Sequence, residues 1–352
     1  MLTLNDSGTT EKVSILDVLS HRTGLPAYDL VWYWGSLGRK EFLQAVANLP
    51  LVADAFRKTF LYSNLMYGAI GHLFEEIVGE SWESYISRKI FKPLKMNSSS
   101  FRPSPHEPNT AIPYIGVTPT ERTDTSSIAA AGSIRTNLED MTKWLAFLLS
   151  QGKTLSGDHL LSESAVQFIQ EKQIAAENAN PLFFQGLEWL CQEGVGYGLG
   201  WFLGSMNGMK AVFHPGLVDG FSSAIVMIPE KKMGLVALTN LNLSPVPGLL
   251  IQDLLKAIAA STQNSPWIGK YESTAFGTVS IFENGSDCIL GYRHPQWPLK
   301  RKDNASAEFV MSGFGLQIPI SVQFEIENDR AKRLSFPLSL DPTLAPQVFV
   351  RV

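Results

Sequence analysis

The sequence predicts an α+β fold, in which helices flank an antiparallel sheet, followed by a small C-terminal all-β domain. Several segments between residues 14 and 173 carry apolar residues at helical spacing, and alternating apolar runs follow between residues 197 and 239. From Trp267 to Val352 no helical period is present, and short alternating runs are separated by Gly, Asn, Asp and Pro. We therefore predict two domains, residues 1–262 and a β-barrel-like domain of residues 263–352.

The composition is that of a soluble globular protein. Of 352 residues, 45% are hydrophobic and 18% are charged, and the formal net charge is −4. No basic stripe is present, so we expect no nucleic-acid partner. Leu249–Ala260, the longest apolar run, is interrupted by polar residues and is shorter than the roughly 20 residues of a membrane span, so no span is expected. The cytoplasmic or secreted location and the oligomeric state stay open.

Metal and cofactor sites are not expected. Cys191 and Cys288 are far apart, and the six histidines form no His-x-x-x-His pair, so no metal-ligand spacing is present. The glycines of Gly196–Gly200 superficially resemble a dinucleotide-binding loop. This stretch lacks the strand–turn–helix context and the later acidic residue of such a loop, which favours a packed strand.

The N-terminal part is predicted to be mainly helical. Residues 97–127, rich in Ser, Pro, Thr and Asn, are predicted to form a long surface loop, and the small residues of Ala129–Arg135 an extended segment. Thr136–Glu139 has the pattern of a capping box that begins a helix. The predicted helices are Ser14–Ser20, Arg39–Asn48, Leu65–Val78, Ser81 to Pro93, Thr136 to about Ser150, Ser162–Gln173 and about Gly248–Ala259.

The sheet is predicted from four runs in the second half of the first domain. Pro229–Met233 joins the last two runs, which should therefore form an antiparallel hairpin. The predicted strands are Tyr197–Leu203, Ala211–His214, Phe221–Ile228 and Gly234–Thr239. In the C-terminal domain the clearest runs are Thr278–Phe282, Glu308–Met311 and Ile320–Ile326.

Two short stretches can carry chemistry. Tyr62 stands just before an apolar helix, where nearby cations would favour its phenolate and a hydroxyl nucleophile could pass it a proton. Asn64 follows two residues later and could contact a substrate carbonyl. Gly216, in His214-Pro215-Gly216, would let a substrate backbone approach, and the N–H of Leu217 could act as an oxyanion donor. Taken singly, such residues are more often packing or turn residues.

A third segment gives these stretches a family context. Ile15–Pro26, which contains Leu19-Ser20-His21, resembles the Leu-Leu-Ser-His stretch of the serine β-lactamase and penicillin-recognising superfamily. It is most similar to the branch with class C β-lactamases, D-aminopeptidases, carboxylesterases and acyltransferases. Tyr62-Ser63-Asn64 matches the Tyr-x-Asn motif of that family, and His214-Pro215-Gly216 matches its third motif. The resemblance covers roughly residues 12–260, in the order of the family.

The resemblance implies a β-lactamase/transpeptidase-like sheet and acyl-enzyme hydrolysis of a small-molecule ester, amide or peptide, without a cofactor. Tyr62 would be the general base that shuttles the proton of a serine nucleophile, and Asn64 would contact substrate. His214 would replace the lysine of the third motif. Gly216 would lie against the substrate, and Leu217 would supply an oxyanion N–H.

The nucleophile of the family is missing from its expected place. The family carries it in a Ser-x-x-Lys motif upstream of the Leu-Ser-His stretch. Here the single Ser-x-x-Lys is Ser150-Gln151-Gly152-Lys153, which follows the other two motifs and is predicted to end a helix. We expect an N-terminally truncated serine hydrolase that is inactive as given, with an unpaired sheet edge and exposed apolar surface. The alternatives are a non-catalytic binding or scaffold protein and, in the full-length form, an acyltransferase.

Overall fold

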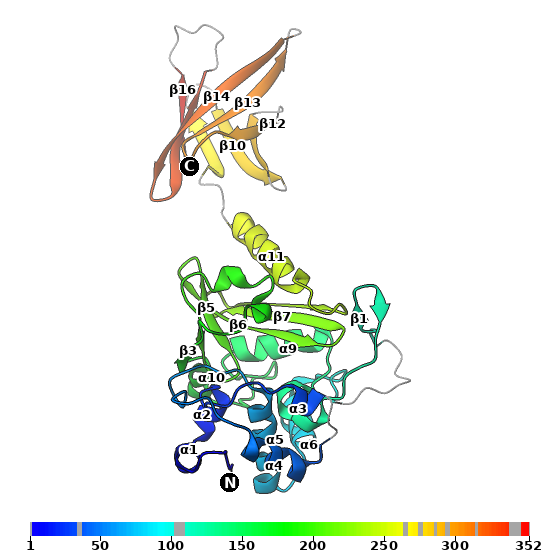
Figure 1. Ribbon diagram of the computed structural model, residues 1–352. Coiled ribbons are helices and arrows are strands. Elements are labelled where there is room, and N and C mark those ends of the chain that lie inside the picture. The colour runs from blue at the N-terminus through cyan, green and yellow to red at the C-terminus, as the bar shows by residue number, and fades with distance from the viewer. Residues whose placement is uncertain are drawn as a thin grey trace. The chain divides into compact units, whose positions relative to one another are not determined.

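The computed structural model describes residues 2–33, 37–101, 110–262, 267–273, 277–284, 287–292, 296–313, 316–337 and 346–351. The chain divides into two compact units, Met1–Asp253 and Leu254–Val352 (Figure 1). The predicted domain boundary falls after residue 262. The next four residues, 263–266, lie outside the described residues.

The helical part of the first unit is built around α5, Asn64–Val78. One face of α5 is buried and includes Leu65, Met66 and Ala69, as the predicted helical spacing requires. This face packs against Phe42 and Val18 of neighbouring helices in one apolar cluster. The other helices around it are α1 (Ser7–Lys12), α2 (Ile15–Leu19), α3 (Leu30–Tyr33), α4 (Arg39–Asn48), α6 (Trp82–Ile86), the π-helix η1 (Ser87–Phe91) and α7 (Lys92–Leu94).

Two predictions for the middle of the chain are wrong. Ala129–Arg135 does not run extended, because α8 (Ala129–Gly132) follows the 3-10 turn η2 (Ser126–Ile128). Small side chains let this turn approach α5, where a Cβ on Gly71 would lie 2.8 Å from the Cβ of Ala130. The next helix, α9 (Leu138–Leu149), is capped by Asn137 and not by Thr136, since Asn137 Oδ1 accepts the Asp140 N–H at 2.9 Å.

The region of residues 97–127 is only partly irregular. A small hairpin joins β1 (Tyr114–Ile115) to β2 (Thr118–Pro119), and residues 102–109 lie outside the described residues. Further on, Ser162 caps α10 (Glu163–Ile169), which ends earlier than the predicted Gln173. The Gln173 N–H instead donates to the carbonyl of Tyr197, so the chain enters the sheet there.

The sheet of the first unit has six antiparallel strands in chain order. The predicted hairpin is confirmed, because residues 222–228 of β7 pair antiparallel with residues 233–239 of β8. The predicted strand Tyr197–Leu203 is instead two strands, since Gly200 has a φ of +78° and the chain turns back there. The strands are β3 (Ile174–Ala175), β4 (Gly196–Tyr197), β5 (Phe202–Met206), β6 (Met209–Val218), β7 (Phe221–Ile228) and β8 (Met233–Thr239).

Helix α9 lies along one face of this sheet (Figure 1), where Leu145 and Phe147 pack against Val212 and Met227. The α11 helix (Val246–Thr262) follows β8. In the described residues β8 is an outer strand of the sheet with one partner, β7. Exposed apolar side chains nearby are Leu238, Leu243, Val246, Leu249 and Leu250. That this edge and these side chains result from missing N-terminal strands stays a prediction.

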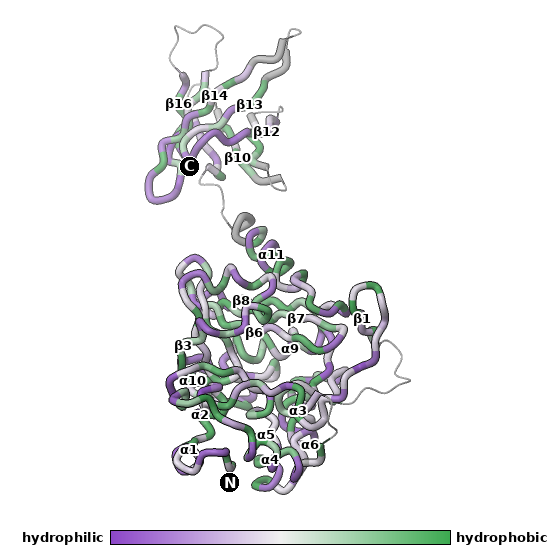
Figure 2. Tube along the Cα trace, viewed as in Figure 1, coloured by the Kyte–Doolittle hydropathy of each residue, from purple (hydrophilic) through white to green (hydrophobic). Residues whose placement is uncertain are grey.

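The second unit contains a closed eight-stranded antiparallel barrel, which confirms the predicted all-β domain. Its interior is filled by apolar side chains, with the Trp267 ring stacked on Phe324 at a centroid distance of 4.5 Å. Figure 2 shows both hydrophobic and hydrophilic stretches along its strands. These are β9 (Gly269–Ser273), β10 (Gly277–Asn284), β11 (Asp287–Tyr292), β12 (Gln296–Arg301), β13 (Ser306–Gly313), β14 (Leu316–Glu327), β15 (Arg330–Phe336) and β16 (Gln347–Arg351).

None of the helices within the described part of the chain combines the length and the apolar character needed to cross a membrane.

Candidate active site

Tyr62 is held in place by the backbone on both sides of it. The Leu61 N–H donates to the carbonyl of His21 at 2.8 Å, and the Ser63 N–H donates to His21 Nδ1 at 3.1 Å. Ser63 has an extended backbone and is the N-cap residue of α5, without a side-chain capping bond, so the chain passes from this clamp directly into the rigid helix. The half-buried Tyr62 ring therefore has a defined position at the helix start.

His21 organises this position, a role that its sequence context alone does not predict. Its imidazole is buried, and because Nδ1 accepts a hydrogen bond, the neutral ring carries its proton on Nε2. Burial, and after it the charge of His214, holds the pKa of His21 well below its usual value. Its ring centroid lies 4.3 Å from that of Tyr62. The one sequence signal for this role was its place in the Leu-Ser-His stretch.

The structure brings Tyr62 and His214 together, with 6.1 Å between their ring centroids. His214 lies on β6, and its Nδ1 is 2.6 Å from the Pro215 carbonyl, so Nδ1 carries the proton. Nε2 is then an acceptor for the Tyr197 hydroxyl at 3.4 Å. Burial lowers the pKa of His214 to about 4, against the opposing effect of the Pro215 carbonyl. At neutral pH this imidazole is uncharged.

Aromatic rings surround Tyr62. The ring centroids of Phe183, Phe202 and Tyr197 lie 4.9, 6.5 and 6.5 Å from it. Burial, and after it the charge of Asp29, raises the pKa of Tyr62 far above its usual value. The phenol is therefore protonated at neutral pH, and it can act as a base only when a cation is brought beside it.

The amide of Asn64 is already engaged. Its Nδ2 donates to Asp29 Oδ1 at 3.1 Å, and the Trp32 indole donates to the same oxygen at 2.7 Å. Asp29 directly precedes α3, so this short helix is tied to the start of α5. A substrate that contacts the Asn64 side chain has to compete with this bond.

Gly216 and Leu217 lie in the part of β6 that pairs with β7 alone. The register with β5 ends at Phe213, whereas β7 continues to pair, with Gly216 opposite Ser223 and Leu217 opposite Ser222. Beyond Phe213 the edge of β6 on the β5 side has no strand partner in the described residues. A Cβ on Gly216 would lie 2.2 Å from Ser223 Oγ but 3.6 Å from Ser223 Cβ, so a larger residue here requires the Ser223 hydroxyl to rotate away.

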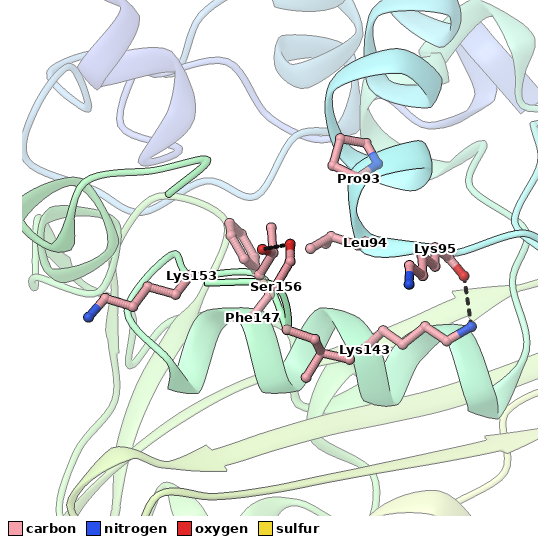
Figure 3. A pocket seen from close by; sticks show the side chains of 9 residues that line it. Pro93, Leu94, Lys95, Lys143, Phe147, Lys153 and Ser156 are labelled. Carbon is pink, nitrogen blue, oxygen red and sulfur yellow. Dashed lines mark hydrogen bonds between the residues drawn. The ribbon is translucent and has the colours of Figure 1, made fainter. Parts of the chain in front are cut away.

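Ser150-Gln151-Gly152-Lys153 ends a helix, as the sequence predicted. Ser150 is the C-cap of α9, and Gly152 has a φ of +83°. Lys153 lines a pocket beside α7 and α9, and its ammonium points away from the other lining residues in Figure 3. Lys143, which also lines it, is held by Asp140, Glu139 and the Lys95 carbonyl. These contacts describe a helix end and an ion-pair network.

No group of three or more His, Cys, Asp or Glu side chains in the described residues is arranged to hold a metal ion. The described side chains around Tyr62 carry phenol, imidazole, amide and carboxylate groups.

Comparison with known proteins identifies the family. A family model described as Beta-lactamase matches residues 4–260. The unguisins hydrolase ungD of Aspergillus violaceofuscus is 29% identical over 256 residues, which are 67% of this chain and 44% of that protein. Protein flp of Staphylococcus aureus is 27% identical over 255 residues, which are 70% of this chain and 47% of that protein. The chain thus spans less than half the length of these curated relatives.

Solved structures share the fold. The octameric penicillin-binding protein homologue from Pyrococcus abyssi has a TM-score of 0.60 and 20% identity, over 99% of this chain and 80% of that chain. A class C beta-lactamase mutant has a TM-score of 0.56 and 18% identity, over 71% of this chain and 72% of that chain. The family-model match over residues 4–260 places this chain in the beta-lactamase family.

Proposed function

We propose that this chain carries the second and third motifs of a serine hydrolase site that works through an acyl-enzyme. The observation that carries the proposal is the approach of Tyr62 and His214, whose rings lie 6.1 Å apart although one precedes α5 and the other lies on β6. Family membership and the relative named as a hydrolase support it. The proposed substrates are small esters, amides or peptides.

In this proposal Tyr62 is the general base. A serine hydroxyl attacks the substrate carbonyl carbon and gives its proton to the Tyr62 phenolate, while negative charge develops on the carbonyl oxygen. The N–H of Leu217, on the open edge of β6, donates to that oxygen. Expulsion of the leaving group takes the proton back from Tyr62, and water then hydrolyses the acyl-serine by the same steps. Gly216 keeps the β6 backbone close to substrate.

The electrostatics of the described site explain why Tyr62 needs a further group. Burial and Asp29 both raise its pKa, and no cation among the described residues opposes them. In the family, the Ser-x-x-Lys motif brings both the serine and a lysine ammonium, which would favour the phenolate. His214 is neutral here and can accept or donate a hydrogen bond, but it does not replace that charge.

The first experiment asks whether residues 1–352 act alone. The chain is incubated with a fluorescent acyl-serine probe and with a nitrophenyl ester. We expect neither labelling nor turnover, because no Ser-x-x-Lys precedes the Tyr-x-Asn motif in these residues. Sequencing of the native transcript is the companion test. An in-frame Ser-x-x-Lys upstream supports the hydrolase, and its absence refutes it.

The second experiment tests the role of Tyr62 in a form that carries the Ser-x-x-Lys motif. We expect Tyr62→Phe to lower turnover about 10²–10⁴-fold, the usual contribution of a general base. Tyr28→Phe is the matched control, because it also removes one phenol hydroxyl, which donates to the Pro50 carbonyl away from the site. Equal activity of both variants would remove Tyr62 from the mechanism.

A non-catalytic binding protein is the second candidate. It is favoured by the bond between Asn64 and Asp29 and by the protonated Tyr62, since both are stable arrangements without a nucleophile. Covalent labelling or turnover by residues 1–352 would exclude this candidate. Measuring the products with a competing alcohol or amine acceptor distinguishes a hydrolase from an acyltransferase.

A further inference from the structure

One side chain of the glycine-rich stretch Gly196–Gly200 reaches the third motif. Tyr197 lies on β4 and is 1% exposed, and its hydroxyl is 3.4 Å from His214 Nε2. The contact joins two strands that are not neighbours, because β5 lies between β4 and β6 in the sheet. The sequence predicts only a packed strand here, and the structure adds a side-chain contact to it.

The position of Tyr197 is fixed by its backbone and by its ring. Its carbonyl accepts the Gln173 N–H at 2.8 Å, and its neighbours in the sheet are Ile174 of β3 and Phe202 of β5. Its ring centroid lies 4.8 Å from that of Phe202 and 5.1 Å from that of Phe60. A hydroxyl on a ring held in this way has a defined place, so its approach to the third motif follows from the fold.

Tyr67, on α5, is a second hydrogen-bond partner of the Tyr197 hydroxyl. The Tyr67 hydroxyl donates to the Leu19 carbonyl at 2.6 Å, and its oxygen accepts from the Gly200 N–H. Because the one proton of this hydroxyl is used at Leu19, the Tyr67 oxygen can only accept from Tyr197. The single hydroxyl proton of Tyr197 thus faces two acceptors, the Tyr67 oxygen and His214 Nε2.

The other nitrogen of the His214 ring is engaged within β6. Nδ1 donates to the Pro215 carbonyl at 2.6 Å, so both ring nitrogens have a partner inside the chain. The backbone groups of residues two apart point to the same edge of a strand, so the Pro215 carbonyl lies on the edge that carries the Leu217 N–H. The His214 ring is therefore tied to the edge to which the proposed function assigns the carbonyl oxygen of the substrate.

We propose that Tyr197 is a positioning residue of the third motif. Its hydroxyl donates to Nε2 of His214, which keeps the ring proton on Nδ1 and the ring against the Pro215 carbonyl. Tyr67 competes for the same hydroxyl proton and so limits the strength of that bond. Through His214, Tyr197 holds the edge of β6 that carries the Leu217 N–H. The effect on a reaction rests on the proposed function, whereas the hydrogen bond does not.

The first test uses residues 1–352 with ¹⁵N-labelled histidine, so it needs no turnover. NMR at neutral pH records both ring nitrogens of His214, which are assigned by the loss of their signals in His214→Gln. We expect a protonated Nδ1 and an unprotonated Nε2. In Tyr197→Phe the Nε2 signal should move downfield, as for a nitrogen that accepts no hydrogen bond. In Tyr67→Phe it should move upfield, because the competing acceptor is removed and the bond from Tyr197 strengthens.

Tyr28→Phe is the matched control, because it removes a phenol hydroxyl that donates to the Pro50 carbonyl and should leave both His214 signals unchanged. Opposite shifts in Tyr197→Phe and Tyr67→Phe cannot come from a general loss of packing, since each variant keeps its ring and loses one hydroxyl. Tyr67→Phe also serves if Tyr197→Phe fails to fold, as judged by its melting temperature.

The second test uses the form that carries the Ser-x-x-Lys motif. Tyr197→Phe should lower kcat about tenfold, the effect of losing one buried hydrogen bond, and should leave KM nearly unchanged. The reason is that the Leu217 N–H acts on charge that develops on the carbonyl oxygen only in the transition state. Tyr28→Phe should keep the kcat of the wild type.

A proton on Nε2 of His214 in the wild type, or an unchanged Nε2 signal in Tyr197→Phe, would overturn the hydrogen bond. Shifts of Nε2 in the same direction in both variants would overturn the competition with Tyr67. An unchanged kcat in Tyr197→Phe, or a rise in KM alone, would overturn the positioning role. If the NMR shifts are as expected but the form with Ser-x-x-Lys hydrolyses nothing, the hydrogen bond stands and the proposed function fails.

Discussion

Asp17 provides the sharpest test of how the structure positions Tyr62. Its carboxylate is fully buried. Two arginines donate to it, Arg22 through Nε at 2.7 Å and Arg57 through Nε at 2.9 Å and Nη2 at 2.8 Å. Ser14 donates its N–H at 3.0 Å and its hydroxyl at 2.7 Å. These bonds tie α2 and the turn that carries His21 to the segment leading to Tyr62. We expect Asp17→Asn to destabilise the first unit and loosen this turn.

The size of the effect follows from the contacts. Removing one partner of a buried ion pair costs about 3–5 kcal/mol. Arg57 has 48% of its side chain exposed, so water can solvate it after the change, and we expect the lower end, about 3 kcal/mol. For a unit of this size that corresponds to a fall in melting temperature of roughly 6–12 °C.

The assay is urea unfolding of the wild-type and variant chains, followed by tryptophan fluorescence and far-UV circular dichroism. Glu80→Gln is the matched control, since it removes one carboxylate from the exposed Arg88 pair, which contributes about 0–1 kcal/mol. A loss below about 1 kcal/mol for Asp17→Asn, similar to that of a surface pair, would refute the reasoning.

The same carboxylate predicts a pH dependence. Burial favours protonation of Asp17, but the bonds from Arg57, Ser14 and Arg22 outweigh it and lower its pKa from 3.8 to about 2. Because the folded pKa lies below the unfolded one, the stabilisation is fully present above pH 3.8 and is lost as the pH falls towards 2. The difference in unfolding free energy between wild type and Asp17→Asn should therefore shrink in that range.

Three further predictions concern the site and the domains. Gly216→Ala should destabilise the sheet by about 0.5–1.5 kcal/mol, because the Ser223 hydroxyl, whose Oγ would lie 2.2 Å from the new Cβ, has to rotate away. Unfolding of the Gly216→Ala/Ser223→Ala double variant should show partial rescue. The imidazole of His214 should stay neutral down to about pH 5 in an NMR titration, since its pKa is about 4. Residues 263–352, expressed alone, should fold into a β protein by circular dichroism, because the barrel is closed and has its own core.

The controls for these predictions are internal to the chain. Gly8→Ala places its Cβ 3.6 Å from the nearest atom and should cost little, so an equal loss at Gly216 would contradict the clash. Protonation of His214 near pH 6.5 would show that the ring is solvated. A disordered 263–352 fragment would move the proposed boundary.

The sequence by itself determined the features that depend on local residue patterns. The apolar spacing of Leu65–Val78 predicted α5, the turn after Ile228 predicted the β7–β8 hairpin, and the alternation beyond Trp267 predicted a β domain. The order of the Leu-Ser-His, Tyr-x-Asn and His-Pro-Gly motifs indicated the family. Local periodicity is sufficient for such conclusions, because secondary structure follows the spacing of apolar residues over a few turns.

What only the tertiary structure decided were contacts between residues far apart in the chain. The clamp of His21 on Tyr62, the bond of Asp29 to Asn64 and the contact of Gly216 with Ser223 each join separate elements. The same holds for the helical turn at Ala129–Gly132, where small side chains pack against α5. No spacing rule encodes these contacts, because burial and hydrogen-bond partners depend on which elements pack together. The sequence therefore identified the motifs, whereas packing determined the protonation states of Tyr62 and His214 and the residues that contact them.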